Sequence, residues 1–320
     1  MSLLELRHLS KTYPGANGAV VQAVSDVSLT IAPGEVLGVV GESGCGKSTL
    51  GRSLLRLIEP TAGEVLFEGR DLVGLGKRDM KSVRRDLQII FQDPFGSLNP
   101  RHTVGGIIGE PLEVHRVGTR AERRARVTEL LKLVGLPEDA ANRYPHEFSG
   151  GQRQRIAIAR ALALEPKLLV ADEAVSALDV SIQSQIINLI ADLQKRLNLS
   201  IMFISHDLSV IRHVSDRIAV MYLGRIVEIG PAEEIMTAPK HPYTQALLSA
   251  IPRPGAARGG RIVLEGELPD PANPPAGCAF HTRCPKVMDI CHRQRPLLAR
   301  PANVEPGSES EVACHLYEAA

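Results

Sequence analysis

A glycine-rich loop is the feature that most constrains how this chain can fold. Residues 41–49 read GESGCGKST, directly after the apolar run of residues 36–40 and ahead of helix-forming sequence. A strand, a glycine-rich loop and a helix in this order are typical of a phosphate-binding P-loop. Glycines let successive backbone N–H groups turn towards one point, and the helix N-terminus adds partial positive charge. The pattern therefore predicts an α/β fold that binds a polyphosphate, although a chance glycine-rich turn is the alternative.

Two residues of this loop have defined roles in the pattern. Lys47 is expected to reach the β- and γ-phosphates, and Ser48 is expected to ligate Mg²⁺. Cys45 occupies a position that the pattern leaves free, so a tolerated small residue is the simplest interpretation. The nucleotide-binding residues predicted here are Gly41, Ser43, Gly44, Cys45, Gly46, Lys47, Ser48 and Thr49.

An acidic pair follows a second apolar run. Residues 168–171 read LLVA and end in Asp172 and Glu173. Buried parallel strands deliver functional groups at their carboxyl ends, so the run is predicted to be a Walker B strand. Asp172 would hold Mg²⁺, and Glu173 would act as the general base that polarises the attacking water. For an isolated acidic pair, a solvated loop is the alternative.

A second glycine-rich segment, residues 148–152, reads FSGGQ and precedes the apolar helical sequence of residues 155–164. Its Ser149, Gly150 and Gly151 would stand at the start of that helix, where N–H groups and the helix dipole attract an anion. A plain helix N-cap is the alternative. The segment FSGGQ resembles the signature motif of the ATP-binding-cassette (ABC) ATPases, which ordinarily reads LSGGQ.

Further motifs of the ABC family match in order. Tyr13 resembles the A-loop aromatic that stacks on adenine, Gln92 the Q-loop glutamine, residues 176–179 (SALD) the D-loop, and His206 the H-loop histidine. The resemblance implies that Gln92 senses Mg²⁺ and the attacking water. It also implies that His206 contacts the γ-phosphate and holds Glu173 in register.

In the ABC family two ATPase subunits enclose ATP between them. The resemblance implies that Ser149, Gly150, Gly151 and Gln152 bind ATP held by the opposite subunit. One position departs from the family pattern, because Ala174 stands where a proline usually follows the catalytic glutamate. Losing the fixed φ of proline predicts slower or looser closure of the site rather than inactivity.

A narrower resemblance covers nearly the whole chain. Residues 91–100, 144–146, 241–248 and 273–284 are similar to the dipeptide and oligopeptide importer ATPases, and most similar to the second ATPase subunit of such permeases. This implies a paralogous ATPase partner, two transmembrane permease subunits and, indirectly, an external substrate-binding protein. Residues 95–101 would line the groove for coupling helices. Nickel and glutathione importers share much of the pattern, so the cargo stays open.

Composition narrows the remaining function classes. The formal net charge of +1 gives no basic surplus for nucleic acid, and no apolar run approaches the roughly 18 to 20 residues that span a bilayer. We therefore expect a soluble, cytoplasmic chain, and the ABC resemblance implies that it acts as a peripheral subunit on the cytoplasmic face of the inner membrane. A soluble ABC ATPase acting in DNA repair or on ribosomes is a rival hypothesis, although such chains usually carry a long coiled coil or two cassettes. A metal-sensing regulator is a third.

The tail carries a cysteine cluster. Cys278, Cys284, Cys291 and Cys314 lie in a proline-rich segment with little capacity for its own apolar core. In a reducing compartment such cysteines indicate metal ligands or spare thiols. The peptide-importer resemblance implies a four-iron four-sulfur cluster, and an all-thiolate set suits one. Zinc and unligated thiols are the alternatives.

These features predict a RecA-like P-loop ABC ATPase core with an antiparallel β subdomain, a helical insertion and a loop-rich C-terminal extension. The capping pair Thr119 and Glu122 and the apolar spacing after it indicate a helix in the insertion, stopped by Gly135. The predicted parts are residues 1–92 (core with Walker A), 93–164 (helical subdomain with the signature), 165–235 (core with Walker B, D-loop and H-loop) and 236–320 (extension).

Overall fold

The computed structural model describes residues 2–15, 18–251, 262–302 and 308–318. The chain divides into two compact units. The first comprises Met1–Ile31, Val36–Val73 and Ile204–Ala320, and the second comprises Ala32–Glu35 and Gly74–Phe203. The tail prolines Pro252 and Pro254, which helped to predict a loop, lie outside the described residues.

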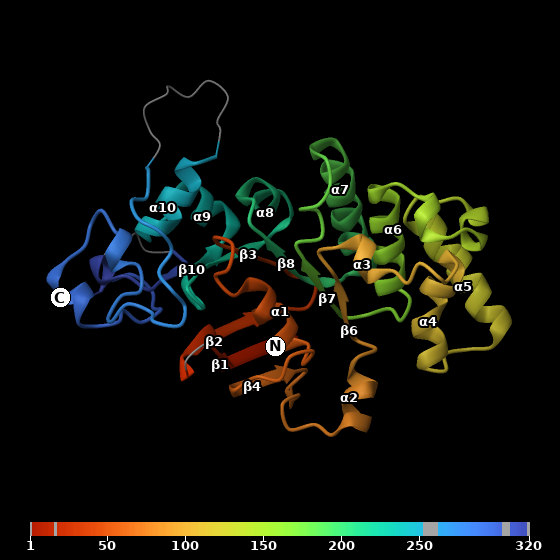
Figure 1. Cartoon of the computed structure of the whole chain (residues 1–320), viewed down its shortest axis with the longest axis horizontal. Helices are drawn as coiled ribbons and strands as arrows, with labels where there is room; N and C mark the ends of the chain where they lie inside the picture. The colour runs from red at the N-terminus through yellow and green to blue at the C-terminus, as the bar shows by residue number, and fades with distance from the viewer. Residues whose placement is uncertain (1, 16–17, 252–261, 303–307, 319–320) are drawn as a thin grey trace. The chain divides into compact units, whose positions relative to one another are not determined.

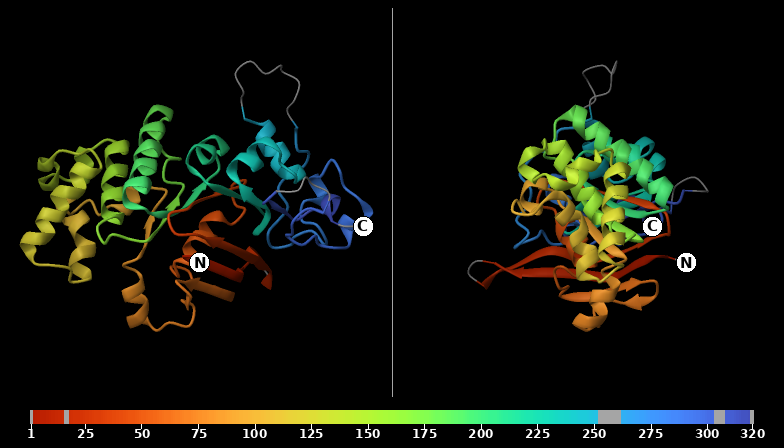
Figure 2. Two further views of the ribbon diagram at one scale, coloured as in Figure 1. Left: turned by 180° about the vertical axis from the view of Figure 1, so that it is seen from behind. Right: turned by 90° about the vertical axis from the view of Figure 1, so that its right-hand side faces the viewer.

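A four-stranded antiparallel sheet forms one layer of the first unit. Its order is β2 (Val20–Ile31), β1 (Leu4–Pro14), β4 (Ala62–Phe67) and β5 (Arg70–Asp71). Leu4 on β1 faces Ile31 on β2 and Phe67 on β4. Leu4 and Leu6 are both buried, as alternate residues of a strand with one covered face should be. The right-hand view of Figure 2 shows the two long strands of this layer in red.

A second group of strands in this unit carries the glycine-rich loop. Strand β3 (Val36–Val40) runs parallel to β9 (Arg217–Tyr222), which pairs antiparallel with β10 (Arg225–Pro231). The short β11 (Glu311–Val312) adds to β10 from the tail. All five residues of β3 are buried, so the apolar run predicted as a strand is one.

The helices of the first unit are α1 (Lys47–Leu54), α8 (Leu208–Val214), α9 (Ala232–Thr237) and α10 (Pro242–Ser249), all visible in Figure 1. Helices α8 and α9 pack on this second group of strands, whereas α1 contacts β1 and β2. Helix α8 packs on β3 at Gly38, where an added Cβ would lie 2.5 Å from the hydroxyl oxygen of Ser215. The absent side chain thus sets how closely the helix approaches the strand.

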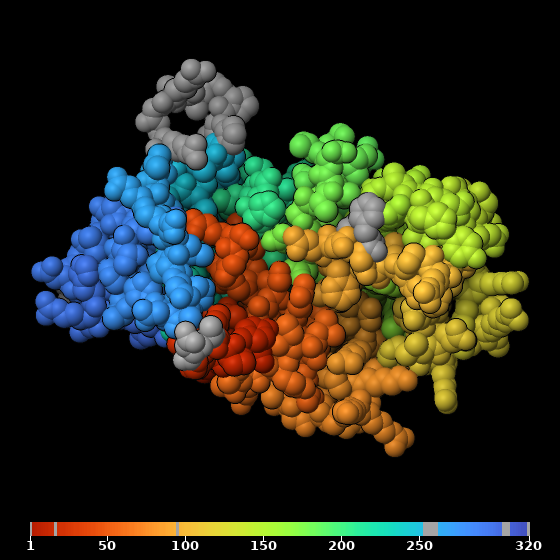
Figure 3. All heavy atoms as spheres, in the orientation of Figure 1, coloured from red at the N-terminus to blue at the C-terminus, as the bar shows by residue number. Residues whose placement is uncertain are grey.

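The tail is loop-rich, as predicted, but it packs into the first unit. Among its described residues after position 261, the regular pieces apart from β11 are the short 3-10 helices η4 (His281–Arg283), η5 (Asp289–His292) and η6 (His315–Tyr317). The N–H of Gln22 on β2 donates to the carbonyl of Pro271, at 3.1 Å. In Figure 3 the blue tail atoms accordingly adjoin the red N-terminal strands.

Parallel strands also organise the second unit. Strand β6 (Leu87–Ile90) runs parallel to β7 (Leu168–Asp172), and β8 (Ser200–Ser205), whose residues 200–203 belong to this unit, follows β7 in the sheet order. Helices α2 (Lys77–Val83) and α7 (Val180–Leu197) accompany them. The predicted strands at residues 168–171 and 201–204 are therefore confirmed to within a residue at each end.

The helical insertion forms the rest of this unit. It contains α3 (Pro94–Ser97), α4 (Val104–Val114), α5 (Arg120–Leu133), η2 (Glu138–Asn142), η3 (Pro145–Glu147) and α6 (Gly150–Ala161). Helix α4 packs against both α5 and α6. The helix predicted at residues 155–164 begins five residues earlier, because Ser149 caps the chain at the first glycine. Among the described residues no helix is both long and apolar enough to cross a bilayer.

The predicted capping box at the start of α5 is present. The hydroxyl of Thr119 accepts the N–H of Glu122 at 3.3 Å, and the Glu122 carboxylate accepts the N–H of Thr119 at 2.6 Å. These backbone bonds hold the pKa of Glu122 below its usual value. Gly135, with φ of 73°, follows the last turn, as the sequence predicted.

We expect Thr119→Ala to lower the free energy of unfolding by about 1 kcal/mol, because one N-terminal N–H loses its partner. The shift should appear in the midpoint of urea unfolding. Thr128→Ala, the same change within α5, is the control and should be neutral or slightly stabilising, since alanine favours helix interiors. Equal destabilisation by both changes would contradict the capping role.

Candidate functional site

The P-loop joins the end of β3 to the start of α1 in the first unit. Gly46 precedes α1 with φ of 103°, and an added Cβ there would lie 1.9 Å from the carbonyl oxygen of Ala23. At Gly41 an added Cβ would lie 2.1 Å from the carbonyl oxygen of Met221. Backbone on both sides of the loop therefore excludes any side chain at these two positions.

Lys47 extends back across the loop from the first turn of α1. Its Nζ donates to the carbonyls of Gly41 at 2.9 Å and Glu42 at 3.0 Å, and lies 3.9 Å from the Cys45 sulfur. The side chain is only 3% exposed, so its ammonium is held within the loop. Burial raises the pKa of the Cys45 thiol, which fits the predicted inert small residue rather than a reactive one.

The remaining predicted nucleotide residues of the first unit differ in exposure. Ser43 and Gly44 are exposed at the turn of the loop, whereas Ser48 and Thr49 are half-buried on α1. Tyr13 lies near the end of β1, half-buried, with the Lys11 ammonium 5.0 Å from its ring centroid. His206 lies exposed directly after β8.

In the second unit two predicted catalytic residues come together. Gln92 follows β6 by two residues and Glu173 follows β7 by one, and these strands are parallel neighbours. The Gln92 amide Nε2 donates to a Glu173 carboxylate oxygen at 2.9 Å. Asp172, the last residue of β7, is fully buried. The Gln92 amide and the Glu173 carboxylate thus meet at the carboxyl edge of these parallel strands.

The backbone at Glu173 has an unusual conformation. Its φ is 49°, in the left-handed region that non-glycine residues seldom adopt. Ser176 fixes the turn, because its hydroxyl and its N–H both donate to the Glu173 carbonyl, at 3.0 and 3.1 Å. Ala174 between them is buried, in the place where the family usually has proline.

The FSGGQ segment caps α6 in the second unit. The Ser149 hydroxyl accepts the Gln152 N–H at 3.4 Å, and the Gln152 side chain accepts the Ser149 N–H at 3.0 Å. Both residues are exposed, so the helix start is open to a partner. Gly151 approaches α7 so closely that an added Cβ would lie 2.5 Å from Ile182. The D-loop residue Leu178 would lie 3.4 Å from a Cβ at Gly150.

Sequence reasoning missed the contacts between the tail and the P-loop. Arg283 in η4 makes a bidentate ion pair with the Glu42 carboxylate, with distances of 2.8 and 3.1 Å. The Tyr243 hydroxyl on α10 accepts the Glu42 N–H at 2.9 Å. Residues 241–248 belong to the peptide-importer pattern, but nothing in the sequence links them to residue 42.

The predicted iron–sulfur site gains no support as a formed ligand group. Among the described residues, which include all four tail cysteines, no three His, Cys, Asp or Glu side chains are arranged to hold a metal ion. The thiols do influence one another: burial, with smaller effects of Cys278, Cys284 and Cys291, raises the pKa of Cys314 to about 12. Burial likewise raises the pKa of Cys278 to about 11.

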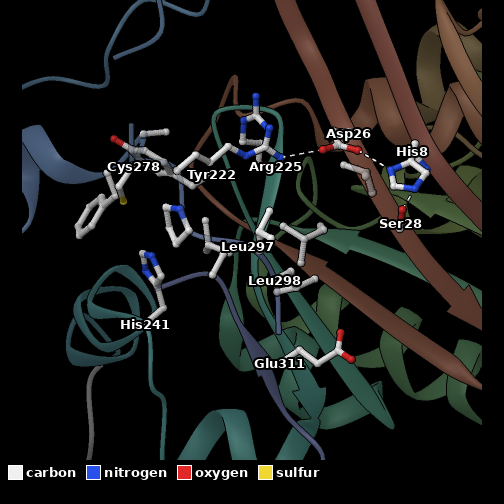
Figure 4. Close-up of a pocket in the computed structure, with 18 residues that line it drawn as sticks. His8, Asp26, Ser28, Tyr222, Arg225, His241, Cys278, Leu297, Leu298 and Glu311 are labelled. Atoms are coloured by element: carbon white, nitrogen blue, oxygen red, sulfur yellow. Dashed lines mark hydrogen bonds and ion pairs between the residues drawn. The ribbon is translucent and has the colours of Figure 1, made fainter. Parts of the chain in front are cut away.

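A cavity of about 340 Å³ opens in the first unit between β2, β10 and the tail. Figure 4 shows Cys278 and His241 at one end of it and Asp26 and His8 at the other, where the His8 ring lies 2.8 Å from Asp26. Residues 41–49 do not line this cavity. It is therefore not the place where the P-loop binds phosphate.

Comparison with known proteins shows the family of this chain. Residues 24–176 match the ABC transporter family, and residues 227–291 match the C-terminal region of oligopeptide/dipeptide transporters. The oligopeptide transport ATP-binding protein AppF of Bacillus subtilis is 54% identical, over 99% of this chain and 98% of that protein. The chain belongs to the ABC peptide-transporter ATP-binding proteins. A putative peptide import ATP-binding protein of Brucella ovis is 56% identical over 95% of both chains.

Solved structures support the fold of this ABC ATP-binding protein. It is similar to the ABC cassette MJ0796, solved as a dimer in a post-hydrolysis state with ADP and Pi, with a TM-score of 0.65 and 33% identity over 72% of this chain and 98% of that one. CbiO1 of Clostridium perfringens, part of an ABC transporter complex, gives a TM-score of 0.66 and 30% identity over 74% and 91%. The predicted P-loop ABC ATPase fold is confirmed, and the chain is an ATPase of this family.

We expect Ala174→Pro to leave the ATPase rate of this ABC protein equal or raised, because a fixed φ favours the turn that follows Glu173. The rate should be measured in the assembled transporter. Ala177→Pro, at an exposed position three residues further on, is the control for the effect of any proline in this segment. A large fall in rate with Ala174→Pro would show that the alanine is required.

Proposed function

We propose that this chain is the ATP-hydrolysing motor of an importer for dipeptides or oligopeptides. The observation that carries the catalytic part is the hydrogen bond between Gln92 and Glu173, which joins a polar amide to a carboxylate at the ends of neighbouring parallel strands. The peptide cargo is supported by the match of residues 227–291 to the oligopeptide/dipeptide transporter region and by the peptide transport names of its relatives.

We assign the catalytic roles as follows. Glu173 takes the proton of the attacking water, and Gln92 orients the Glu173 carboxylate through their hydrogen bond. His206 supports the γ-phosphate. Lys47 releases its bonds to the loop carbonyls and pairs with the β- and γ-phosphates, while Tyr13 stacks on adenine.

We propose Mg²⁺ as the cation of the site, because its predicted ligands share one donor chemistry. The Ser48 hydroxyl, the Gln92 amide and the Asp172 carboxylate all offer oxygen, which Mg²⁺ prefers to nitrogen or sulfur. When bound, Mg²⁺ supplies charge that offsets the developing negative charge on the phosphates. Asp172 is the last residue of β7 and is fully buried, so burial restricts the freedom of its side chain before any cation binds.

We further propose that the motor is a dimer with a paralogous ATPase. The helix start, with Ser149 and Gln152 exposed and Gly150 and Gly151 half-buried, then completes the ATP site of the opposite subunit. Closing and opening of the ATPase dimer would drive two transmembrane permease subunits. An external binding protein would deliver cargo to these subunits. This places the chain at the cytoplasmic face of the inner membrane, as a peripheral subunit. Nickel or glutathione as cargo, or a soluble ABC ATPase outside transport, are the competing functions.

We also propose that the four tail cysteines hold an iron–sulfur cluster. The proposal is supported by the four-cysteine set, which suits such a cluster, and by the influence of Cys278, Cys284 and Cys291 on the Cys314 thiol. A bound cation would reverse the raised thiol pKa values, since thiolates are stabilised by metal.

Glu173→Gln should bind ATP but abolish its hydrolysis, because the amide is isosteric with the carboxylate but accepts no proton. We expect turnover in the assembled transporter to fall by at least about 100-fold, the usual contribution of a general base. Glu129→Gln, an exposed glutamate on α5, is the matched control and should keep the full rate. Undiminished hydrolysis by Glu173→Gln would remove Glu173 from its role.

The iron–sulfur proposal predicts a brown protein after anaerobic purification, with bound iron and sulfide and a broad visible absorption band. Cys314→Ser should remove the colour and the iron. Cys45→Ser changes the one cysteine outside the tail and should leave both unchanged. A colourless, iron-free protein with full ATPase activity would overturn the proposal.

A further inference from the structure

A tail arginine reaches the P-loop from a position 241 residues away in sequence. Two guanidinium nitrogens of Arg283 contact both carboxylate oxygens of Glu42, at 2.8 and 3.1 Å. The Arg283 side chain is 8% exposed and that of Glu42 28%, so solvent screens this pair less than it screens a surface ion pair. Both residues lie in the first unit.

A buried aromatic cluster fixes the position of this arginine. Phe280, three residues before Arg283, packs edge-on against Tyr222 at 5.3 Å and tilted against Tyr243 at 5.5 Å between ring centroids. Tyr243 in turn accepts the Glu42 N–H through its hydroxyl. Glu42 is therefore held at its backbone by α10 and at its side chain by the tail.

The start of α10 is itself fixed. The Tyr243 N–H donates to Nδ1 of His241 at 3.1 Å, and burial lowers the pKa of His241 to about 3. The ring is therefore neutral at physiological pH and keeps the lone pair that accepts this bond. The Tyr243 hydroxyl thus reaches the P-loop from a helix whose first turn is capped.

The negative charge of the Glu42 carboxylate disfavours the binding of polyphosphate by this loop. Glu42 is the second residue of the nine-residue loop, and Lys47 donates to its carbonyl oxygen. A bare carboxylate in this place would repel the phosphates through the protein interior. The bidentate pair with Arg283 cancels that charge and turns the carboxylate towards the tail.

We propose that Arg283 is a positioning residue for the nucleotide: by neutralising and orienting Glu42 it keeps the P-loop receptive to a polyphosphate. The C-terminal extension then contributes to ATP binding within the same chain, although it lies far from the loop in sequence. The inference rests on ATP binding by the P-loop and does not depend on the cargo or the partner.

The test measures nucleotide affinity in the full chain with Arg283→Gln. We expect this variant to bind the non-hydrolysable ATP analogue AMP-PNP about tenfold more weakly at low salt. The reason is that the uncompensated Glu42 carboxylate then repels the phosphates. The loss should be smaller for ADP, smallest for AMP, and reduced at high salt. A purely structural role would weaken all three nucleotides alike.

A double-mutant cycle isolates the charge. Glu42→Gln should bind at least as tightly as the wild type, and adding Arg283→Gln to it should change affinity by less than about twofold. Arg295→Gln is the matched control, because Arg295 is a tail arginine paired with Asp26 on β2 at 3.0 Å, and it should leave affinity unchanged. Full additivity of the two changes in the cycle would overturn the proposal.

Arg283→Lys is a second variant, which keeps the proposal testable if Arg283→Gln does not fold. A lysine side chain keeps the positive charge but cannot make the two parallel hydrogen bonds of a guanidinium. We therefore expect the affinity of Arg283→Lys for AMP-PNP to lie between those of the wild type and Arg283→Gln. Affinity equal to the wild type in every Arg283 variant that folds would also overturn the role. A wild-type chain that binds no nucleotide would instead refute ATP binding itself, and the two failures are thus distinguishable.

Discussion

The close approach of backbone to the two P-loop glycines is the constraint on which the nucleotide site depends. Carbonyl oxygens of Ala23 and Met221 stand where any side chain at Gly46 and Gly41 would begin. The loop is therefore shaped by its contacts with β2 and β9, and not only by its own flexible residues. Lys47 completes this shape, because its ammonium bridges two carbonyls of the loop.

Neighbouring backbone also positions the side chains at the carboxyl ends of the parallel strands β6 and β7 in the second unit. Because β6 and β7 are parallel and in register, residues that follow them emerge side by side. Gln92 and Glu173 are 81 positions apart in sequence, yet their side chains are hydrogen-bonded. The left-handed backbone at Glu173, secured by Ser176, determines where its carboxylate points.

The sequence predicted those features whose signal is local. The apolar runs before the P-loop and before Asp172 are strands, and the capping box at Thr119 is formed, because strand burial and helix capping depend on residues a few positions apart. Ser149 and the two glycines stand at the start of α6, as predicted, while the apolar spacing of residues 155–164 marks only the later part of that helix. The contact of Arg283 with Glu42 has no periodic or local signal, so only the folded chain reveals it.

The placement of Arg283 gives the tail a physical connection to the nucleotide site. Arg283 directly precedes Cys284, and Phe280 lies between it and Cys278, so the segment that presents the guanidinium to Glu42 also carries two of the tail thiols. Cys278 is further tied to Cys291 by a backbone hydrogen bond of 2.8 Å. The same short segment thus joins the thiols to Phe280, which packs against Tyr222 and Tyr243, and to the arginine. Since a bidentate pair depends on exact geometry, the packing of this segment supports the Arg283–Glu42 contact on which our proposal rests.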